Sequence, residues 1–127
     1  FLVNPGFGIS TAWAYRTLSD FPDALPGQPG RAERLVERLR GGSLSSAARY
    51  LYNSLEIPAL RKYPILGLYQ ECLRELGAPG VLMSGSGSTT FALLACESEA
   101  RSARDRFIER FGPNCWTAVL PAACSVA

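Results

Sequence analysis

The sequence predicts an α+β domain of the ferredoxin-like, split β-α-β type: an antiparallel sheet covered on one face by helices, with extra helices added. Two observations lead to this prediction. Short apolar segments of β-forming residues occur at the start, in the middle and at the end of the chain, and the segments between them carry apolar residues at helical spacing. Once the extra helices are set aside, the order reads β-α-β-β-α-β. The 127 residues, 47% of them hydrophobic, suffice for a single domain 1–127 with its own core.

The elements of the first half follow from apolar runs and their terminators. Phe1 to Val3 is predicted as a strand that ends at Asn4-Pro5-Gly6. A helix is expected to run through Leu18 from Ser10 or Thr11, because a hydroxyl there can accept the free N–H bonds of the first turn. The prolines and glycines of residues 19–30 predict a loop. Helices are then expected over 31–40, ended by two glycines, and over 43–50.

The second half contains the clearest helix and a hairpin. Pro58 can occupy the first turn of a short helix that ends at Tyr63. Residues 65–76 form an apolar stripe at helical spacing, followed by Gly77 and Pro79 as a stop. Segments 80–84 and 89–96 are predicted as two strands of a hairpin. A helix capped by Ser98 is expected to end at Phe111, and a last strand spans 115–120.

The composition excludes several classes of function. Thirteen Lys and Arg residues against eleven Asp and Glu give a net charge of +2, which predicts no strong field for nucleic acid. Because the chain has no His, Ser-His-Asp sites, Cys-His sites and His-ligated zinc are absent. The sequence has no apolar run of membrane-spanning length and no signal peptide, so a cytoplasmic protein is expected. The cysteines are expected to be buried free thiols in a reducing compartment rather than disulfides or metal ligands: Cys72, Cys96, Cys115 and Cys124.

The hairpin loop Gly85-Ser86-Gly87-Ser88 is the segment most suited to binding. Glycines permit positive φ and close backbone approach, so that N–H groups can turn toward an anion, and serines add uncharged donors; phosphate is the expected guest. The loop is neither a Walker A loop, since no Gly-Lys-Ser/Thr follows, nor a Rossmann fingerprint, since it does not open a helix. The alternative is a hairpin turn without a ligand. Valine at Gly87 is expected to block backbone approach with little loss of fold.

For three other patterns, a structural role is favoured over a functional one. Arginines 101, 104, 106 and 110 are interpreted as a solvated helix face paired with nearby acids, rather than an RNA or phosphate patch. Aromatic pairs at 13/15 and 50/52 could stack on a base, but core packing is the favoured use. Glu56 beside Asn53 could be a catalytic carboxylate, but a capping or helix-tethering role is favoured.

Three stretches together resemble the GHMP small-molecule kinases. Gly77 to Leu93 (GAPGVLMSGSGSTTFAL) resembles their third conserved motif, and Pro5 to Tyr15 (PGFGISTAWAY) resembles the segment that opens their C-terminal domain. Asn53 to Glu56 (NSLE) resembles their Asn-Asp-Leu-Glu element, with Ser54 in place of the usual Asp. The three occur in the family's order over nearly the whole chain.

The resemblance implies a GHMP kinase C-terminal domain. The form it is closest to uses ATP and Mg²⁺ to phosphorylate a hydroxyl of a small molecule, a cytidylyl-linked methylerythritol, in non-mevalonate isoprenoid biosynthesis. By resemblance, Gly85, Ser86, Gly87 and Ser88 line the cleft beside the nucleotide phosphates, and Thr11 lies near the methylerythritol end. The family's longer phosphate loop, and the Asp and Lys nearest the reacting hydroxyl, belong to a preceding N-terminal ATP-binding domain. No catalytic or metal-ligating residue is therefore expected in this chain.

Two alternatives stay open at this stage. One is a free-standing ferredoxin-like module, regulatory or ligand-binding, whose hairpin loop binds an anion without chemistry. The other is the C-terminal domain of another GHMP kinase, such as homoserine or mevalonate kinase. The first residue is Phe1 rather than Met, and Phe1 lies within a predicted strand, so the chain is expected to be cut from a longer kinase and to be inactive alone.

Overall fold

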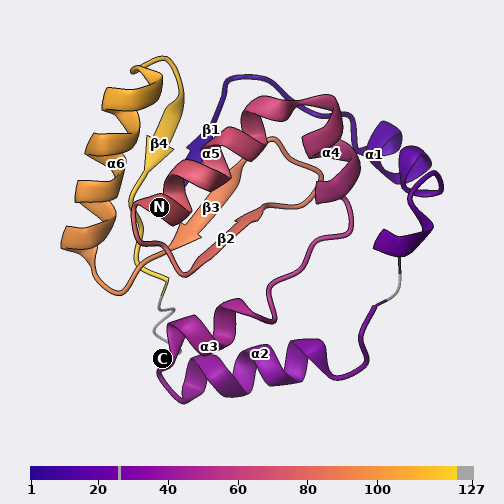
Figure 1. Ribbon diagram of the computed structural model, residues 1–127, viewed down its shortest axis with the longest axis horizontal. Coiled ribbons are helices and arrows are strands. Elements are labelled where there is room, and N and C mark those ends of the chain that lie inside the picture. Colours follow the sequence, from indigo (N-terminus) through magenta and orange to yellow (C-terminus); the bar gives the residue numbers. More distant parts are fainter. Residues whose placement is uncertain (26, 123–127) are drawn as a thin grey trace.

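The strands form one antiparallel sheet in the order β2-β3-β1-β4 (Figure 1). The computed structural model describes residues 1–25 and 27–122. Leu2 lies opposite both Phe91 and Ala118, so the strand that comes first in the sequence lies in the interior of the sheet. This order confirms the predicted split β-α-β class. The strands are β1 (Leu2–Asn4), β2 (Gly80–Met83), β3 (Thr90–Leu93) and β4 (Trp116–Ala118).

The helices begin and end close to the glycines, prolines and hydroxyl residues that predicted them. Ser10 caps the first helix, with its Oγ accepting the N–H of Trp13 at 3.2 Å, and Ser43 caps the third in the same way. Pro58 lies in the first turn of the fourth helix. The helices are α1 (Thr11–Leu18), α2 (Arg31–Arg40), α3 (Leu44–Ala48), α4 (Glu56–Lys62), α5 (Pro64–Glu75) and α6 (Glu97–Phe111), with a 3₁₀ turn η1 at Pro22–Ala24.

The main core lies between one face of the sheet and helices α5 and α6. Its centre is Phe107, which is fully buried, with its ring centroid 4.8 Å from that of Tyr69 and 5.8 Å from that of Phe1 in edge-to-face geometry. Val3, from β1, packs into the same cluster. Such aromatic contacts add to the free energy gained from apolar burial. The core therefore fixes both helices relative to the sheet.

A second buried cluster joins α1, α4 and the end of β2. Ile9 precedes α1, Ala59 belongs to α4 and Met83 ends β2; all three are buried. This cluster lies directly under the loop that follows β2. It thereby connects the N-terminal segment with the glycine-rich segment about 75 residues later in the sequence.

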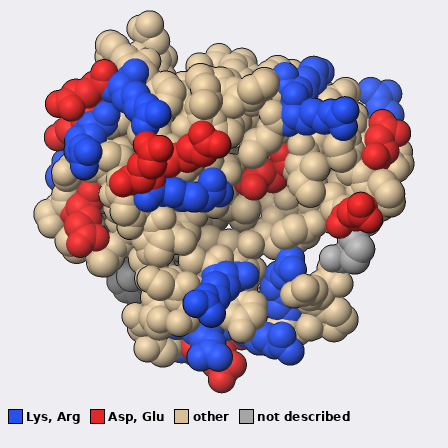
Figure 2. Space-filling view, viewed as in Figure 1, with Lys and Arg blue, Asp and Glu red and all other residues tan. Residues whose placement is uncertain are grey.

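Helices α2 and α3 form a pair that lies below the sheet in the view of Figure 1. No residue of α2 is buried, and Val36 and Leu39 are 45% and 46% exposed. Among the charged side chains that Figure 2 shows over this pair, most are basic. The Arg31 guanidinium lies 4.3 Å from the centroid of the Tyr52 ring, a cation–π contact that links α2 to the segment before α4.

Several boundaries differ from the sequence prediction; the helix predicted over 43–50 ends at Ala48, and the strand predicted over 115–120 spans Trp116–Ala118. The loop 19–30 contains η1, because Pro22 favours the first position of a tight turn; Pro26 of this loop lies outside the described residues. The strand predicted over 89–96 ends at Leu93, because Leu93 pairs with Gly80, where β2 begins. Ser98 is not the cap of α6. Cys96 holds that position, and the Glu99 carboxylate accepts the Ala95 N–H at 3.2 Å.

The cysteine prediction is correct in pairing state and only partly correct in burial. Cys72, Cys96 and Cys115 are free thiols. Cys72 is buried, Cys115 is half-buried and Cys96 is exposed at the start of α6, because its strand ends earlier than predicted. Cys124 lies outside the described residues. Among the described helices, none has both the length and the apolar character needed to span a membrane.

Candidate functional site

The loop between β2 and β3 is a tight, glycine-dependent turn. Ser84 N–H donates to the Thr89 carbonyl at 2.8 Å, and Gly87 N–H donates to the Ser84 carbonyl at 3.0 Å. Gly85 and Gly87 have φ of +56° and +86°, a region that L-residues rarely occupy. The two glycines therefore let the chain reverse direction and keep both strands in register.

The two glycines face different surroundings. A Cβ placed on Gly85 would meet no atom within 4 Å. A Cβ on Gly87 would lie 2.6 Å from Met83 Sδ and 2.9 Å from Ile9 Cδ1, inside the second core cluster. A side chain at Gly87 would thus point into the core rather than toward an approaching ligand. The expectation that valine at this position would cause little loss of fold is wrong for this reason.

Ser88 attaches the loop to the N-terminal segment of the chain. It is only 1% exposed, and its hydroxyl donates to the Phe7 carbonyl. Asn4 Nδ2 donates to Thr89 Oγ1 at 2.9 Å, which gives a second connection to the same N-terminal segment. Both bonds join residues more than 80 positions apart, so the loop and the segment that leads to α1 form one structural unit. The Ser88 hydroxyl is directed at the backbone here.

Thr11 and Ser86 come together on the open side of this unit. Their hydroxyl oxygens lie 3.0 Å apart in a hydrogen bond, with Thr11 at the first position of α1. Sequence reasoning assigned these residues to two different regions, the substrate side and the phosphate side. The structure places them side by side at the start of a helix, where partial positive charge accumulates.

The open side offers N–H groups as well as hydroxyls. Within residues 1–25 and 27–122, no acceptor takes a hydrogen bond from the N–H of Gly85, Ser86, Thr11 or Ala12. Four N–H groups without a protein acceptor and two hydroxyls therefore belong to the two segments that the Thr11–Ser86 hydrogen bond joins. Such a donor set suits the oxygens of an anion such as phosphate.

The Asn53–Glu56 segment contacts the loop from the edge of the sheet. Asn53 Nδ2 donates to the carbonyls of Met83 and Gly85 at 2.9 and 2.7 Å. Glu56 Oε2 accepts the Met83 N–H at 2.7 Å and Gln70 Nε2 at 2.8 Å. These bonds confirm the tethering interpretation of Glu56. The sequence resemblance had marked the element, but only the fold shows that it reaches Met83.

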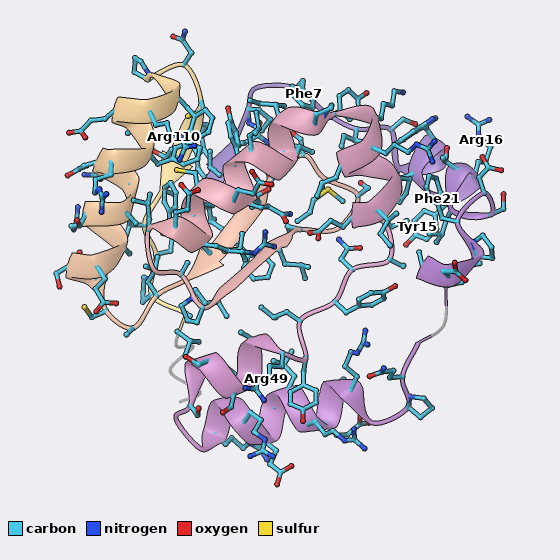
Figure 3. The ribbon with its side chains drawn as sticks, in the orientation of Figure 1. Phe7, Tyr15, Arg16, Phe21, Arg49 and Arg110 are labelled. Atoms are coloured by element: carbon cyan, nitrogen blue, oxygen red, sulfur yellow. The ribbon has the colours of Figure 1, made fainter. Side chains whose placement is uncertain are left out.

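The aromatic residues considered for base stacking divide into two groups. Trp13 is half-buried and packs edge-on against Tyr63, with Lys62 Nζ 4.1 Å from its ring centroid, so core packing is confirmed for it. Tyr15 is 63% exposed, which contradicts core packing; Figure 3 shows it among the side chains around α1. Tyr52 is 41% exposed, so core packing is wrong for it as well; its hydroxyl donates to the Ala24 carbonyl, and its ring lies against the Arg31 guanidinium.

The arginines of α6 lie on a solvated face, as predicted, and three of the four pair with acids; the exposed Arg106 makes no ion pair within the part of the chain that the structure describes. Arg101 pairs with Glu97 one turn away at 2.6 Å, and Arg104 pairs with Asp105 at 2.7 Å. Arg110, labelled in Figure 3, reaches Glu75 of α5 at 2.6 Å. Exposed pairs of this kind contribute little to stability, and their charges are already neutralised locally. Groups of three or more potential metal-ligating side chains do not occur among the described residues.

Comparison with known proteins gives a consistent family assignment. The family model described as "GHMP kinases C terminal" matches residues 32–114. A 4-diphosphocytidyl-2-C-methyl-D-erythritol kinase from Geotalea daltonii is 36% identical over 105 residues, covering 83% of this chain and 35% of the relative. The protein of the same name from Citrifermentans bemidjiense is 40% identical over 103 residues, covering 80% and 34%. The chain thus spans little more than a third of the length of these curated relatives.

Solved structures show the same likeness in three dimensions. A crystal structure of 4-(cytidine 5'-diphospho)-2C-methyl-D-erythritol kinase superposes with a TM-score of 0.70 at 35% identity, over 91% of this chain and 40% of that one. The L. major mevalonate kinase in complex with R-mevalonate superposes with a TM-score of 0.64 at 21% identity, with the same coverage. The second likeness shows the shared fold alone.

Proposed function

Because the chain belongs to the GHMP kinase C-terminal family, we propose that it is the C-terminal domain of a kinase that phosphorylates a hydroxyl of 4-diphosphocytidyl-2-C-methyl-D-erythritol with ATP, in non-mevalonate isoprenoid biosynthesis. The substrate follows from the names of the relatives that are 36% and 40% identical. The observation that carries the proposal is the Thr11–Ser86 hydrogen bond, which joins the glycine-rich loop to the segment that opens α1. The proposal includes a cytoplasmic location, in keeping with the free thiols of Cys72, Cys96 and Cys115.

The chain's own residues have distinct roles in this proposal. The N–H groups of Gly85 and Ser86 and the Ser86 hydroxyl donate to phosphate oxygens of the nucleotide. Thr11 orients the phosphoryl-accepting end of the substrate, since its hydroxyl lies 3.0 Å from that of Ser86. Gly87 and Ser88 keep the loop seated on the core. Phosphoryl transfer depends chiefly on positioning and on neutralising charge, and these contacts supply positioning.

The remaining groups of the site come from a preceding N-terminal domain. The relatives are nearly three times as long as the part matched here, which leaves room for such a domain. In this proposal it carries the longer phosphate loop, the Asp and Lys nearest the reacting hydroxyl, and the ligands of Mg²⁺. The N–H donors of the Gly85–Ser86 turn fit phosphate oxygens, but an N–H group cannot ligate a cation. When bound with ATP, Mg²⁺ would neutralise charge on the phosphates.

Two conservative substitutions in the full-length parent test the roles of the hydroxyls. Thr11→Val and Ser86→Ala each remove a hydroxyl and leave the loop geometry in place. We expect kcat/KM to fall by about 10- to 100-fold, the loss typical of one hydrogen bond to a charged group. Ser102→Ala on the exposed face of α6 is the matched control. If wild-type parent shows no ATP-dependent phosphorylation of the substrate, or if both variants match the control, the proposal fails.

The chain without the preceding domain is expected to have no measurable kinase turnover. The catalytic Asp and Lys, in this proposal, lie outside it, and a site without them loses nearly all of its rate. A steady-state assay with ATP and the substrate, run on the 127-residue chain and on the parent at equal concentration, measures this. Comparable turnover by both would contradict the division of the site between two domains.

A further inference from the structure

We propose that Asn53 and Glu56 are positioning residues that hold the glycine-rich loop in its binding geometry by taking the place of a missing strand next to β2. The structural part of this inference stands on the hydrogen bonds of the chain itself. Its kinetic part rests on the proposed function.

Strand β2 is an edge strand, and Met83 presents its backbone to the open edge. Within residues 1–25 and 27–122, the sheet order places β3 on one side of β2 and no strand on the other. Ser84 N–H donates to the carbonyl of Thr89, the residue just before β3, and bonding direction alternates along an antiparallel strand. The N–H and carbonyl of Met83, one residue earlier, therefore point away from β3. Backbone groups at such an edge need a partner, because leaving them buried and unpaired is costly.

Asn53 and Glu56 supply both partners. The Glu56 carboxylate accepts the Met83 N–H at 2.7 Å, and the Asn53 amide donates to the Met83 carbonyl at 2.9 Å. A neighbouring strand would make this same pair of bonds, one accepted and one donated. Asn53 Nδ2 also reaches the Gly85 carbonyl at 2.7 Å, so one amide group spans the junction between strand and loop.

A network behind the pair fixes its geometry. Gln70 is 2% exposed and donates through Nε2 to the same Glu56 oxygen at 2.8 Å, while Arg74 donates to Gln70 Oε1 at 3.0 Å. Because Arg74 is a donor only, it sets the orientation of the Gln70 amide. On the other side, Asn53 Oδ1 accepts the Leu55 N–H at 3.0 Å and holds the start of α4. The side chains of Asn53 and Glu56 are thus held in position by contacts other than those with Met83.

Met83 connects Asn53 and Glu56 to the loop through its side chain. Its side chain is 1% exposed and lies where a Gly87 Cβ would be, within 2.6 Å. Asn53 and Glu56 hold the Met83 backbone at the edge of the sheet, and the Met83 side chain packs against Gly87 on the core side of the loop. Freeing the Met83 backbone would therefore loosen the Gly85–Ser86 turn that carries the open N–H groups.

Asn53→Asp is the sharpest test, because the two side chains have the same shape. Asp keeps the oxygen that accepts the Leu55 N–H, but it replaces the donor to Met83 and Gly85 with an anionic oxygen facing two carbonyls. Asn114→Asp makes the same change of charge at an exposed position and serves as the control. Glu56→Leu removes the acceptor for Met83, and Glu56→Gln retains one.

Amide hydrogen exchange in the 127-residue chain gives a readout independent of kinase activity. We expect the N–H groups of Ser84 and Gly87 to exchange about 10- to 30-fold faster in Asn53→Asp and Glu56→Leu. Glu56→Gln and Asn114→Asp should remain within about threefold of wild type. The Ala92 N–H in β3, which donates to the Phe1 carbonyl, reports on the rest of the sheet and should change little. Unchanged loop exchange overturns the inference, as does equal acceleration at Ala92, which would indicate general destabilisation.

Kinetics of the full-length parent give the second readout. We expect kcat/KM for ATP to fall about 10- to 30-fold in Asn53→Asp, with Glu56→Gln restoring most of the activity lost in Glu56→Leu. Normal kinetics despite loosened loop exchange would overturn the positioning role. A wild-type parent without kinase activity would refute the proposed function, while faster loop exchange in the same variants would still support the structural part of the inference.

Discussion

Alanine substitution at the two glycines of the loop should have clearly different costs, although both glycines have positive φ. Gly85→Ala places a methyl group in open space, whereas Gly87→Ala places one between Met83 and Ile9. The comparison separates the need for a left-handed backbone from the need for space beneath the loop. We expect Gly87→Ala to be the more destabilising variant.

The magnitude follows from two contributions. A left-handed backbone conformation costs a non-glycine residue about 1–2 kcal/mol, and this applies at φ of +56° and of +86° alike. Overpacking a buried site costs roughly 1–3 kcal/mol more, and it applies only at Gly87, where the methyl would lie 2.6 Å from Met83 Sδ and 2.9 Å from Ile9 Cδ1. Gly85→Ala should therefore lose about 1–2 kcal/mol of unfolding free energy and Gly87→Ala about 2–5 kcal/mol.

Urea unfolding of the 127-residue chain, followed by far-ultraviolet circular dichroism, measures this difference. The two variants are compared at the same pH and temperature, and equal slopes of free energy against urea would show that the midpoints reflect stability. Equal destabilisation by the two substitutions would refute the reasoning, because the packing contribution would then be absent. A larger loss at Gly85 would refute it more strongly.

Three further predictions concern the core, one thiol and one phenol. Phe107→Ala should lower the unfolding free energy by about 3–5 kcal/mol in urea titrations, because the ring is fully buried among Phe1, Tyr69 and Phe111; a loss below about 1 kcal/mol would contradict this packing. The hydrogen bond with Ser98 lowers the pKa of the exposed Cys96 thiol, so iodoacetamide should modify Cys96 before Cys72 and Cys115 in peptide mapping, and Ser98→Ala should slow it. Burial raises the pKa of the Tyr69 hydroxyl above 10.0, so the unfolded chain ionises first and stability should fall as pH rises above about 10. Tyr69→Phe should reduce that fall in urea titrations at several pH values; an equal decrease of unfolding free energy with pH in wild type and Tyr69→Phe would contradict this prediction.

The element order could be predicted because it depends on local signals. Apolar spacing defines α5, glycines and prolines end most helices, and the first and last strands must meet if the order is β-α-β-β-α-β. The boundaries that differed depend on partners instead. The end of β3 is set by where β2 begins, and the start of α6 by the Glu99 carboxylate reaching Ala95. Neither contact can be read from a window of neighbouring residues.

The site was predictable in its parts but not in its assembly. Sequence reasoning identified the residues of the glycine-rich loop, since glycines and hydroxyls in such a pattern suit an anion. Thr11 was indicated by the family resemblance alone. The sequence did not show that Thr11 touches Ser86, that Ser88 faces the Phe7 carbonyl, or that Gly87 faces the core. Each of these contacts joins segments far apart in the sequence, and they form only when α1, β2 and β3 pack around the second buried cluster.

Ser54, which departs from the Asn-Asp-Leu-Glu element, lies between the residues that make its hydrogen bonds. The hydrogen bonds of the element come from the Asn53 side chain, the Leu55 N–H and the Glu56 carboxylate. The second position contributes none of them, so serine there leaves the hold on Met83 intact. The edge of β2 at Met83 needs one acceptor and one donor at a fixed separation. Because Asn53 and Glu56 meet that need, the first and fourth positions of the element carry the positioning role.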